Sequence, residues 1–288
     1  MKLYPIQCGN FKLDGGAMFG VVPKSLWERT NPADSKNLIE LGTRSLLVED
    51  GKKLILIDCG LGNKQDEKFF GHYSLYGDES LDKNLKKFGF VREDITDVFL
   101  THLHFDHCGG AIEWNDDKTG YRPAFKNAQF WTNENHWQWA TEPNPREKAS
   151  FLKENILPMQ ESGQLQFLPT PKTGNYGFAP DLKMDVIFVD GHTEKQMLPV
   201  IQYQGKTIVF AADLIPTAGH IPQVYVMGYD TRPLLTMEEK GKFLKQCVEN
   251  EYLLFFEHDA HHELASLKMT EKGVKLDETF SFNEVFGY

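Results

Sequence analysis

The stretch 101-THLHFDHCGG-110 places three histidines and one aspartate within six residues: His102, His104, Asp106 and His107. It follows 94-DITDVFL-100, a run that predicts a buried strand. A buried imidazole or carboxylate without a partner costs several kcal/mol, so four of them in one short loop need a common partner. Zinc accepts neutral imidazole and carboxylate oxygen. A solvated histidine-rich loop is the alternative, but the preceding strand and the closing pair Gly109-Gly110 disfavour it. The stretch therefore predicts a metal-binding loop.

Two further segments, 46-LLVEDGKKLILID-58 and 198-LPVIQYQGKTIVFAAD-213, each consist of an apolar strand, a turn, a second strand and a terminal aspartate. We predict hairpins with turns at Asp50-Gly51 and Gly205-Lys206. Apolar spacing and capping residues predict helices over 79–88, 144–157 and 238–251. This alternation favours an α/β fold of paired sheets with helices outside them.

The 288 residues, of which 41% are hydrophobic, are expected to form a single domain over 1–288. Residues 62–78 and 114–180 are long connections rich in aromatic side chains. We expect both of them to be insertions around the mouth of a site.

Composition excludes several partners. The net charge is −10 and no basic stripe is present, which disfavours nucleic acid. No apolar run reaches the ~18 residues of a membrane span. The opening residues lack the apolar stretch of a signal peptide, and four scattered cysteines predict free thiols, so we expect a cytoplasmic protein, with a cleaved leader left open.

The pattern HxHxDH resembles the signature of the metallo-β-lactamase superfamily. That family's five motifs occur here in order: Asp58 in LILIDCG, the cluster at 102–107, His192 in VDGHT, Asp213 in FAADL and His258 in FFEHD. The resemblance implies an αββα sandwich of two mixed β-sheets flanked by helices. It also implies one metal held by His102, His104 and His192, a second held by Asp106, His107 and His258, and a bridge formed by Asp213.

The resemblance implies that Asp58 accepts a hydrogen bond from the imidazole of a metal ligand and so orients it. The alternative is that Asp58 only caps the end of the preceding strand. His261 and His262 are expected to lie outside the ligand set, and Cys59 and Cys108 are expected to be small buried side chains.

Two divalent ions that share Asp213 can hold a bridging water whose pKa falls to about 7, which supplies hydroxide at neutral pH. We therefore expect two Zn²⁺ per chain, with other divalent metals also able to serve. Asp106 and Asp213 are the expected catalytic carboxylates, and Asp106 could also steer the nucleophile.

Departures from the family pattern narrow the substrate. The lactam-hydrolysing branch of the family has a cysteine at the fourth motif, where this chain has Asp213, so that branch is disfavoured. The diiron, oxygen-reducing branch has a glutamate at the position of His104, so it is disfavoured as well. N-acyl homoserine lactonases (quorum quenching), aryl-ester and organophosphate hydrolases resembling methyl parathion hydrolase, and glyoxalase II remain. Glyoxalase II needs a cluster of basic residues, usually late in the chain, to bind the anionic glutathione part of its substrate. Residues 269–288 contain no such cluster.

We expect a small-molecule ester or lactone as substrate, with N-acyl homoserine lactone first among the candidates. The expected pocket residues are Phe19, Phe69, Phe70, His220 and Tyr225. A group of lactonases has a tyrosine three positions after the bridging aspartate, where this chain has Pro216, so Tyr225, Tyr229 or His220 would have to replace it.

Two other classes compete with a hydrolase. Sulfur dioxygenases of this fold use one iron and fewer ligands, and a non-catalytic regulator would have lost a ligand. The complete ligand set disfavours both. The sequence does not determine the oligomeric state.

Overall fold

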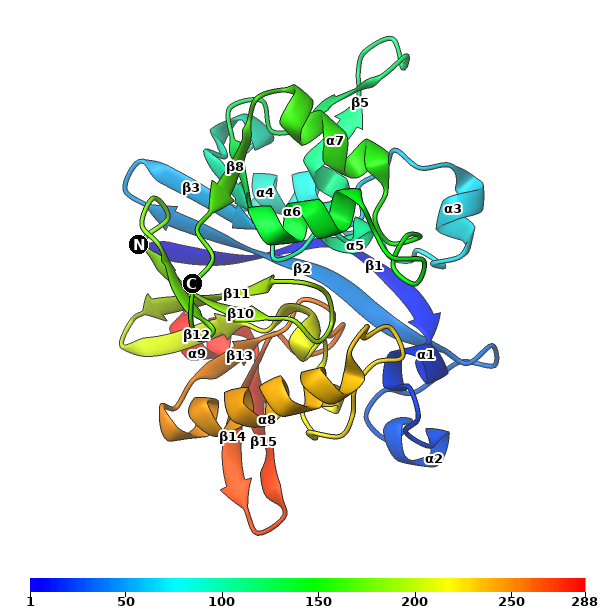
Figure 1. Cartoon of the computed structure of the whole chain (residues 1–288), viewed down its shortest axis with the longest axis vertical. Helices are drawn as coiled ribbons and strands as arrows, with labels where there is room; N and C mark the ends of the chain where they lie inside the picture. The colour runs from blue at the N-terminus through cyan, green and yellow to red at the C-terminus, as the bar shows by residue number, and fades with distance from the viewer. Residues whose placement is uncertain (288) are drawn as a thin grey trace.

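Two β-sheets face each other in the computed structural model, which describes residues 1–287 (Figure 1). The first sheet has the order β1-β2-β3-β4-β7-β8, formed by Lys2–Asp14, Leu38–Asp50, Lys53–Ile57, Asp97–Phe99, Gln129–Asn133 and Leu165–Leu168. Its first three strands are antiparallel, whereas β3, β4, β7 and β8 are parallel. A two-stranded sheet, β5 (Ile112–Trp114) and β6 (Tyr121–Pro123), stands apart.

The second sheet has the order β15-β14-β13-β12-β11-β10-β9. In chain order from β9 to β15, its strands are Tyr176–Ala179, Met184–Val189, Gln196–Tyr203, Lys206–Phe210, Leu253–Phe255, Leu264–Thr270 and Gly273–Phe280. Only β12 and β13 are parallel neighbours, so this sheet is mixed as well. The predicted sandwich of two mixed sheets is confirmed.

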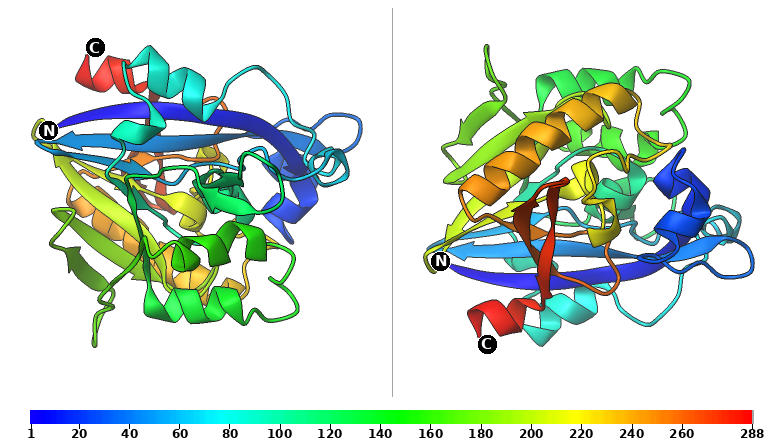
Figure 2. Two further views of the ribbon diagram at one scale, coloured as in Figure 1. Left: turned by 90° about the horizontal axis from the view of Figure 1, so that it is seen from above. Right: turned by 90° about the horizontal axis from the view of Figure 1, so that it is seen from below.

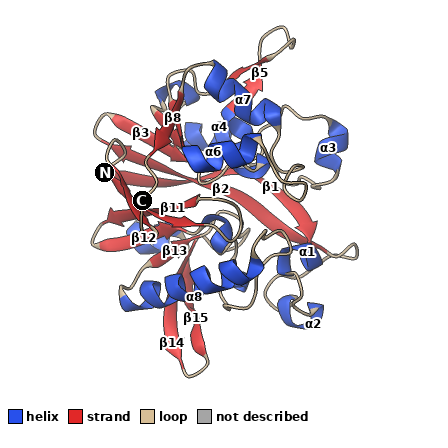
Figure 3. Ribbon diagram, in the orientation of Figure 1, coloured by secondary structure: helices blue, strands red, loops and turns tan. Residues whose placement is uncertain are grey.

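Helices lie outside the sheets (Figures 2 and 3). The α-helices, from α1 to α9, are Gly15–Phe19, Lys24–Trp27, Glu67–Gly71, Leu81–Lys87, Phe105–Cys108, Glu134–Thr141, Lys153–Glu161, Pro233–Glu249 and Phe282–Phe286. Short 3-10 turns, η1 to η4, occupy Arg92–Asp94, Gly109–Ala111, Ala212–Leu214 and Ala218–His220. No helix within residues 1–287 is long and apolar enough to cross a membrane.

The period-2 pattern of β2 explains how the layers hold together. Leu46 and Val48 belong to the apolar cluster shared with the second sheet. Leu47, between them, points the other way and packs in a cluster with residues of α4, α6 and α7. Alternate side chains of one strand therefore join both the inter-sheet core and the outer helix layer.

Local sequence patterns predicted most of these turns and helices close to their observed positions. The first hairpin turns at Gly51-Lys52, one residue later than predicted, because Asp50 already pairs with Lys53. The second hairpin turns at Gln204-Gly205, one residue earlier than predicted, because Tyr203 already pairs with Lys206. The helices expected at 79–88 and 238–251 are α4 and α8.

The helix predicted from residue 144 is wrong, because α7 begins only at Lys153. Asn144 Oδ1 does accept the backbone N–H groups of Arg146 and Glu147. The turn then stops, since the Ser150 carbonyl accepts the N–H of Phe105 instead of continuing a helical ladder.

Residues 114–180 are not one insertion, since they contain β7, β8 and β9, which belong to the two main sheets. The predicted insertion is wrong for these strands: their apolar side chains fill the core, as Phe130 and Trp131 do. The turn at 142–152 does reach the cavity described below.

Candidate metal centre

Loops that follow five strands meet at one edge of the sandwich. β3 and β4 are parallel neighbours, so Asp58 and the 102–107 cluster leave the first sheet at the same edge. β12 and β13 are parallel neighbours in the second sheet, and β10 runs in the same direction, being antiparallel to β11. The segments that follow β10, β12 and β13 carry His192, Asp213 and His258, which are distant in sequence from the 102–107 cluster.

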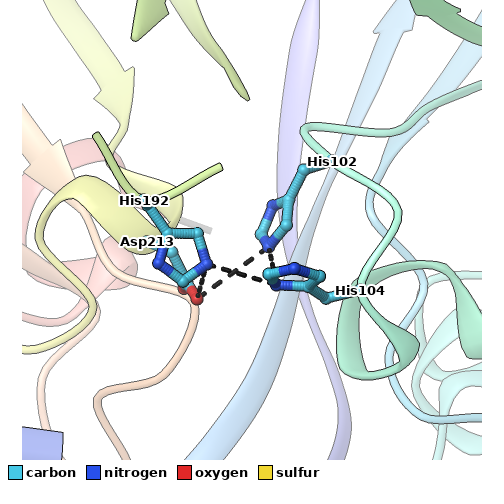
Figure 4. A group of neighbouring side chains, drawn as sticks. All are labelled: His102, His104, His192 and Asp213. Atoms are coloured by element: carbon cyan, nitrogen blue, oxygen red, sulfur yellow. Dashed lines mark hydrogen bonds and ion pairs between the residues drawn. The ribbon is translucent and has the colours of Figure 1, made fainter. Parts of the chain in front are cut away.

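The first donor group consists of His102, His104, His192 and Asp213, all buried, with ligand atoms within 4.8 Å of one another (Figure 4). His104 Nδ1 lies 3.1 Å from His102 Nε2 and 3.2 Å from His192 Nε2. Asp213 Oδ2 lies 3.1 Å from His192 Nε2 and 3.9 Å from His102 Nε2. Three ring nitrogens and one oxygen thus converge on a single point.

The second group consists of Asp106, His107 and His258. Its two imidazoles face each other, with 3.1 Å between the Nε2 atoms. Asp106 Oδ2 lies 3.7 Å from His258 Nε2. Asp213 Oδ1 lies 3.1 Å from the same His258 nitrogen and 3.5 Å from His107 Nε2. The two oxygens of Asp213 therefore face different donor groups, as a bridging carboxylate requires.

These spacings fit metal coordination. Donors at zinc's bond lengths in a tetrahedron lie about 3.3 to 3.6 Å apart, close to the distances of the first group. Asp213 Oδ1 is buried and has no hydrogen-bond partner within residues 1–287. A buried carboxylate oxygen without a donor is costly, and a cation there would remove that cost.

The charges around the two groups also favour a site for bound cations. Six carboxylates gather here, and all but Asp106 are buried: Asp58, Asp106, Glu147, Asp213, Asp230 and Glu257. Across the described part of the chain, the ion-pair partners of these six acids are all histidines. Since no lysine or arginine of residues 1–287 forms an ion pair with these buried anions, they call for another source of positive charge, and divalent cations supply it.

The field of these acids also acts on the imidazoles. Burial alone would lower the pKa of His192, but Asp213 and then Asp230 outweigh it and raise the pKa to about 10. Burial likewise opposes protonation of His258, and Asp213 raises that pKa to about 9. A field that retains a proton on these rings also attracts a metal cation.

Partners outside the two groups orient the rings. His107 Nδ1 lies 3.0 Å from Asp58 Oδ2, the position that the sequence predicted for Asp58. Asp58 is held in turn by the backbone N–H and the hydroxyl of Thr101, at 2.8 and 2.6 Å. His258 Nδ1 lies 2.9 Å from the Gly42 carbonyl. Each contact fixes which nitrogen of a ring faces the centre.

The sequence analysis missed two acids in this outer layer. Asp230 Oδ1 lies 2.9 Å from His192 Nδ1, and Glu257 Oε2 lies 2.9 Å from His107 Nδ1. Glu257 directly precedes the predicted ligand His258, which was a usable signal. Asp230 lies in the irregular segment before α8, and no local pattern marked it.

Two glycines bring the loops together. A Cβ on Gly109 would lie 2.1 Å from the Leu61 carbonyl oxygen, and one on Gly110 would lie 2.1 Å from that of Cys59. The pair that ends the histidine cluster therefore allows the loop after β3 to pack directly against it. Asp58 itself has φ of 55°, an uncommon value for a residue other than glycine.

A cavity of about 410 Å³ opens over the two groups. Its floor contains His104, Asp106, His192, Asp213 and His258. Its apolar wall consists of Phe11, Leu13, Met18, Leu41, Tyr73, Phe105 and Met227. Arg146 and Tyr229 also line it, and Arg146 donates to the Gly228 carbonyl.

The predicted pocket residues Phe19, Phe69, Phe70, His220 and Tyr225 are not among the residues that line this cavity. Phe19 is fully buried behind Met18 and stacks on His220 at 4.1 Å. His220 is occupied by Thr217 Oγ1 and the Met18 carbonyl.

The remaining three belong to a layer behind the wall. Tyr225 meets Phe19 edge-on. Phe69 supports the wall residues Tyr73 and Phe105, and Phe70 packs against Phe69. Aromatic content identified the right segments, but side-chain direction decides which residue faces the cavity.

Asp230→Ala is expected to lower the affinity of the first group for its metal by about 10- to 100-fold, because His192 loses the acceptor that fixes its ring. Competition with a chromogenic chelator measures this. Asp116→Ala, at a side chain that is 89% exposed, is the control. Wild-type affinity in the Asp230 variant would mean that this contact does not support the site.

Comparisons with known proteins agree with this geometry. The metallo-beta-lactamase superfamily model matches residues 38–245. N-acyl homoserine lactonase AiiA of Bacillus thuringiensis subsp. kurstaki is 22% identical over 275 residues, which cover 91% of this chain and 94% of the relative. A probable metal-dependent hydrolase from Staphylococcus aureus superposes with a TM-score of 0.85 at 28% identity, covering 97% of this chain and 96% of the other. AidC, a dizinc quorum-quenching lactonase, gives a TM-score of 0.77 at 22% identity, covering 97% and 95%.

The match over 38–245 spans most of the chain and includes six of the seven candidate ligands, all except His258. The two mixed sheets and the edge on which the ligands meet agree with the fold that the sequence motifs implied. The chain therefore belongs to the metallo-β-lactamase superfamily, and it is a hydrolase.

Proposed function

We propose that this hydrolase is a dizinc lactonase that opens N-acyl homoserine lactones, a quorum-quenching activity. The observation that carries the proposal is Asp213, whose two oxygens face two histidine groups at the floor of a largely apolar cavity. The lactonases among the relatives support the substrate class.

In this proposal one zinc would be held by His102, His104 and His192, the other by Asp106, His107 and His258, and Asp213 would be a ligand of both. When bound, the two cations polarise a carbonyl and supply hydroxide at neutral pH. Asp106 lines the cavity as well as facing His258, so it can also orient the nucleophile or hold a proton for the leaving hydroxyl. The apolar wall binds the acyl chain and excludes water from the reacting carbonyl.

Tyrosines of the cavity could replace the phenol that is missing at Pro216. Tyr73 and Tyr229 line the cavity, whereas Tyr225 does not. Burial raises the pKa of both Tyr73 and Tyr229 to about 12, so both hydroxyls remain donors at neutral pH. Either could hydrogen-bond the lactone carbonyl or its leaving oxygen.

The double variant Tyr73→Phe/Tyr229→Phe is expected to lower kcat for a lactone by about 100-fold, because removing a donor to the developing oxyanion has effects of that size. Tyr225→Phe is the matched control and should keep wild-type kcat. The single variants show which hydroxyl acts. Unchanged kcat in the double variant would leave the reaction without a tyrosine donor.

Aryl-ester or phosphotriester hydrolysis is the second candidate, favoured by the aromatic residues Phe11, Tyr73 and Phe105 in the wall. A panel of lactones, nitrophenyl esters, phosphotriesters and a glutathione thioester separates these reactions. Chelation should abolish turnover, and added zinc should restore it. One iron per chain, rather than two zinc ions, would favour a sulfur dioxygenase.

A further inference from the structure

Glu147 lies unusually close to the candidate metal centre for a residue of a connecting turn. It is 3% exposed, and its Oε1 lies 3.4 Å from His104 Nε2, the ring nitrogen that points away from the first donor group. Neither atom has a hydrogen-bond partner in residues 1–287, so their contact is at ion-pair distance, and the Thr193 side chain also lies beside the Glu147 carboxylate. A buried acceptor and a buried ring nitrogen therefore face each other.

The other oxygen of Glu147 is already occupied. Oε2 accepts the indole N–H of Trp139 at 2.7 Å and the amide of Asn144 at 2.5 Å. The turn is also tied to the histidine cluster, since the Ser150 N–H binds the Glu147 carbonyl and the Ser150 carbonyl accepts the N–H of Phe105. These contacts fix the carboxylate and leave Oε1 directed at His104.

The contact bears on the tautomer of His104. A neutral imidazole carries one hydrogen, and only the other nitrogen has a lone pair for a metal. His104 Nδ1 is the nitrogen that faces His102 and His192. With the hydrogen on Nε2 and directed at Glu147, Nδ1 presents its lone pair to the centre.

We propose that Glu147 is a positioning residue that accepts the Nε2–H of His104 and thereby holds His104 as an Nδ1 ligand of the first metal. The inference rests on the metal-binding part of the proposed function and not on the lactone. Asp58 and Asp230 contact the outward-facing ring nitrogens of His107 and His192 in the same way, but neither acid lines the cavity. Glu147 does line it. The substrate cavity and the support of a metal ligand thus share one carboxylate.

Glu147→Gln tests the proposal without changing size. Trp139 and Asn144 both donate, so the amide oxygen of the new side chain must take their side and its NH₂ group must face His104. An NH₂ group cannot accept a hydrogen, which favours the tautomer with hydrogen on Nδ1 and no lone pair for the metal. We expect one of the two zinc affinities to fall by about 10- to 100-fold, with the other nearly unchanged.

The experiment is chelator competition with zinc on the full chain, together with histidine ¹⁵N chemical shifts, which report the tautomer. Glu142→Ala, an exposed acid of the same turn, is the control and should match the wild type. Glu147→Ala should also lose zinc affinity. If the alanine variant fails to fold, the isosteric Glu147→Gln variant is the one that tests the proposal. Two wild-type affinities and an unchanged His104 tautomer in Glu147→Gln would overturn the inference. A failure to open lactones would contradict only the substrate assignment, because neither readout depends on turnover.

Discussion

Asp213→Ala is expected to lose at least one metal ion and to reduce turnover by at least about a thousand-fold. A methyl group cannot join two cations, and the lost stabilisation of the transition state is worth several kcal/mol, with each 1.36 kcal/mol equal to a factor of ten. The variant also removes the carboxylate that lies within 3.1 Å of both His192 and His258. Elemental analysis of the purified protein and steady-state kinetics measure the two effects.

Thermal unfolding gives a second readout of the Asp213 variant that does not depend on a substrate. A ligand at a thousand times its Kd stabilises the folded state by about 4 kcal/mol, so added zinc should raise the Tm of the wild type clearly more than that of the variant. Asp181→Ala, at an exposed position, should behave as the wild type. Two retained metals and full turnover in Asp213→Ala would show that Asp213 does not bridge.

An eight-carbon acyl homoserine lactone is expected to have a KM roughly two orders of magnitude below that of its four-carbon analogue. Each methylene that is buried contributes about 0.8 kcal/mol, and four of them contribute about 3 kcal/mol. The cavity offers the necessary surface in Phe11, Leu13, Met18, Leu41 and Met227. Its position directly above the two donor groups lets the chain lie along the wall while the ring carbonyl reaches the floor.

Steady-state kinetics on the two lactones measure this dependence. Equal KM values with ring opening of both would place the acyl chain outside the cavity. Ring opening of neither, together with rapid turnover of a nitrophenyl ester or a phosphotriester, would move the enzyme to the second candidate activity.

Much of the fold and of the candidate site could be predicted from local sequence. The hairpin around Asp50-Gly51 was predictable because the conformation of a tight turn depends on its own residues. Seven candidate ligands were predictable because their motifs follow apolar strands and because their order matches one family. The structure brings all seven together in two adjacent groups.

The family and the residues offered to the metals follow from motifs that are local in the chain, so they could be recognised before folding was considered. The surroundings of these residues depend on the folded chain. Asp230 lies 38 residues from His192, and Glu147 lies 43 residues from His104, so no local pattern could pair them. The tertiary structure also decided that Met18 forms the cavity wall while Phe19 lies behind it. Hydrophobicity makes both residues candidates for burial, but the direction of a side chain depends on backbone geometry and on neighbours that only the folded chain brings near.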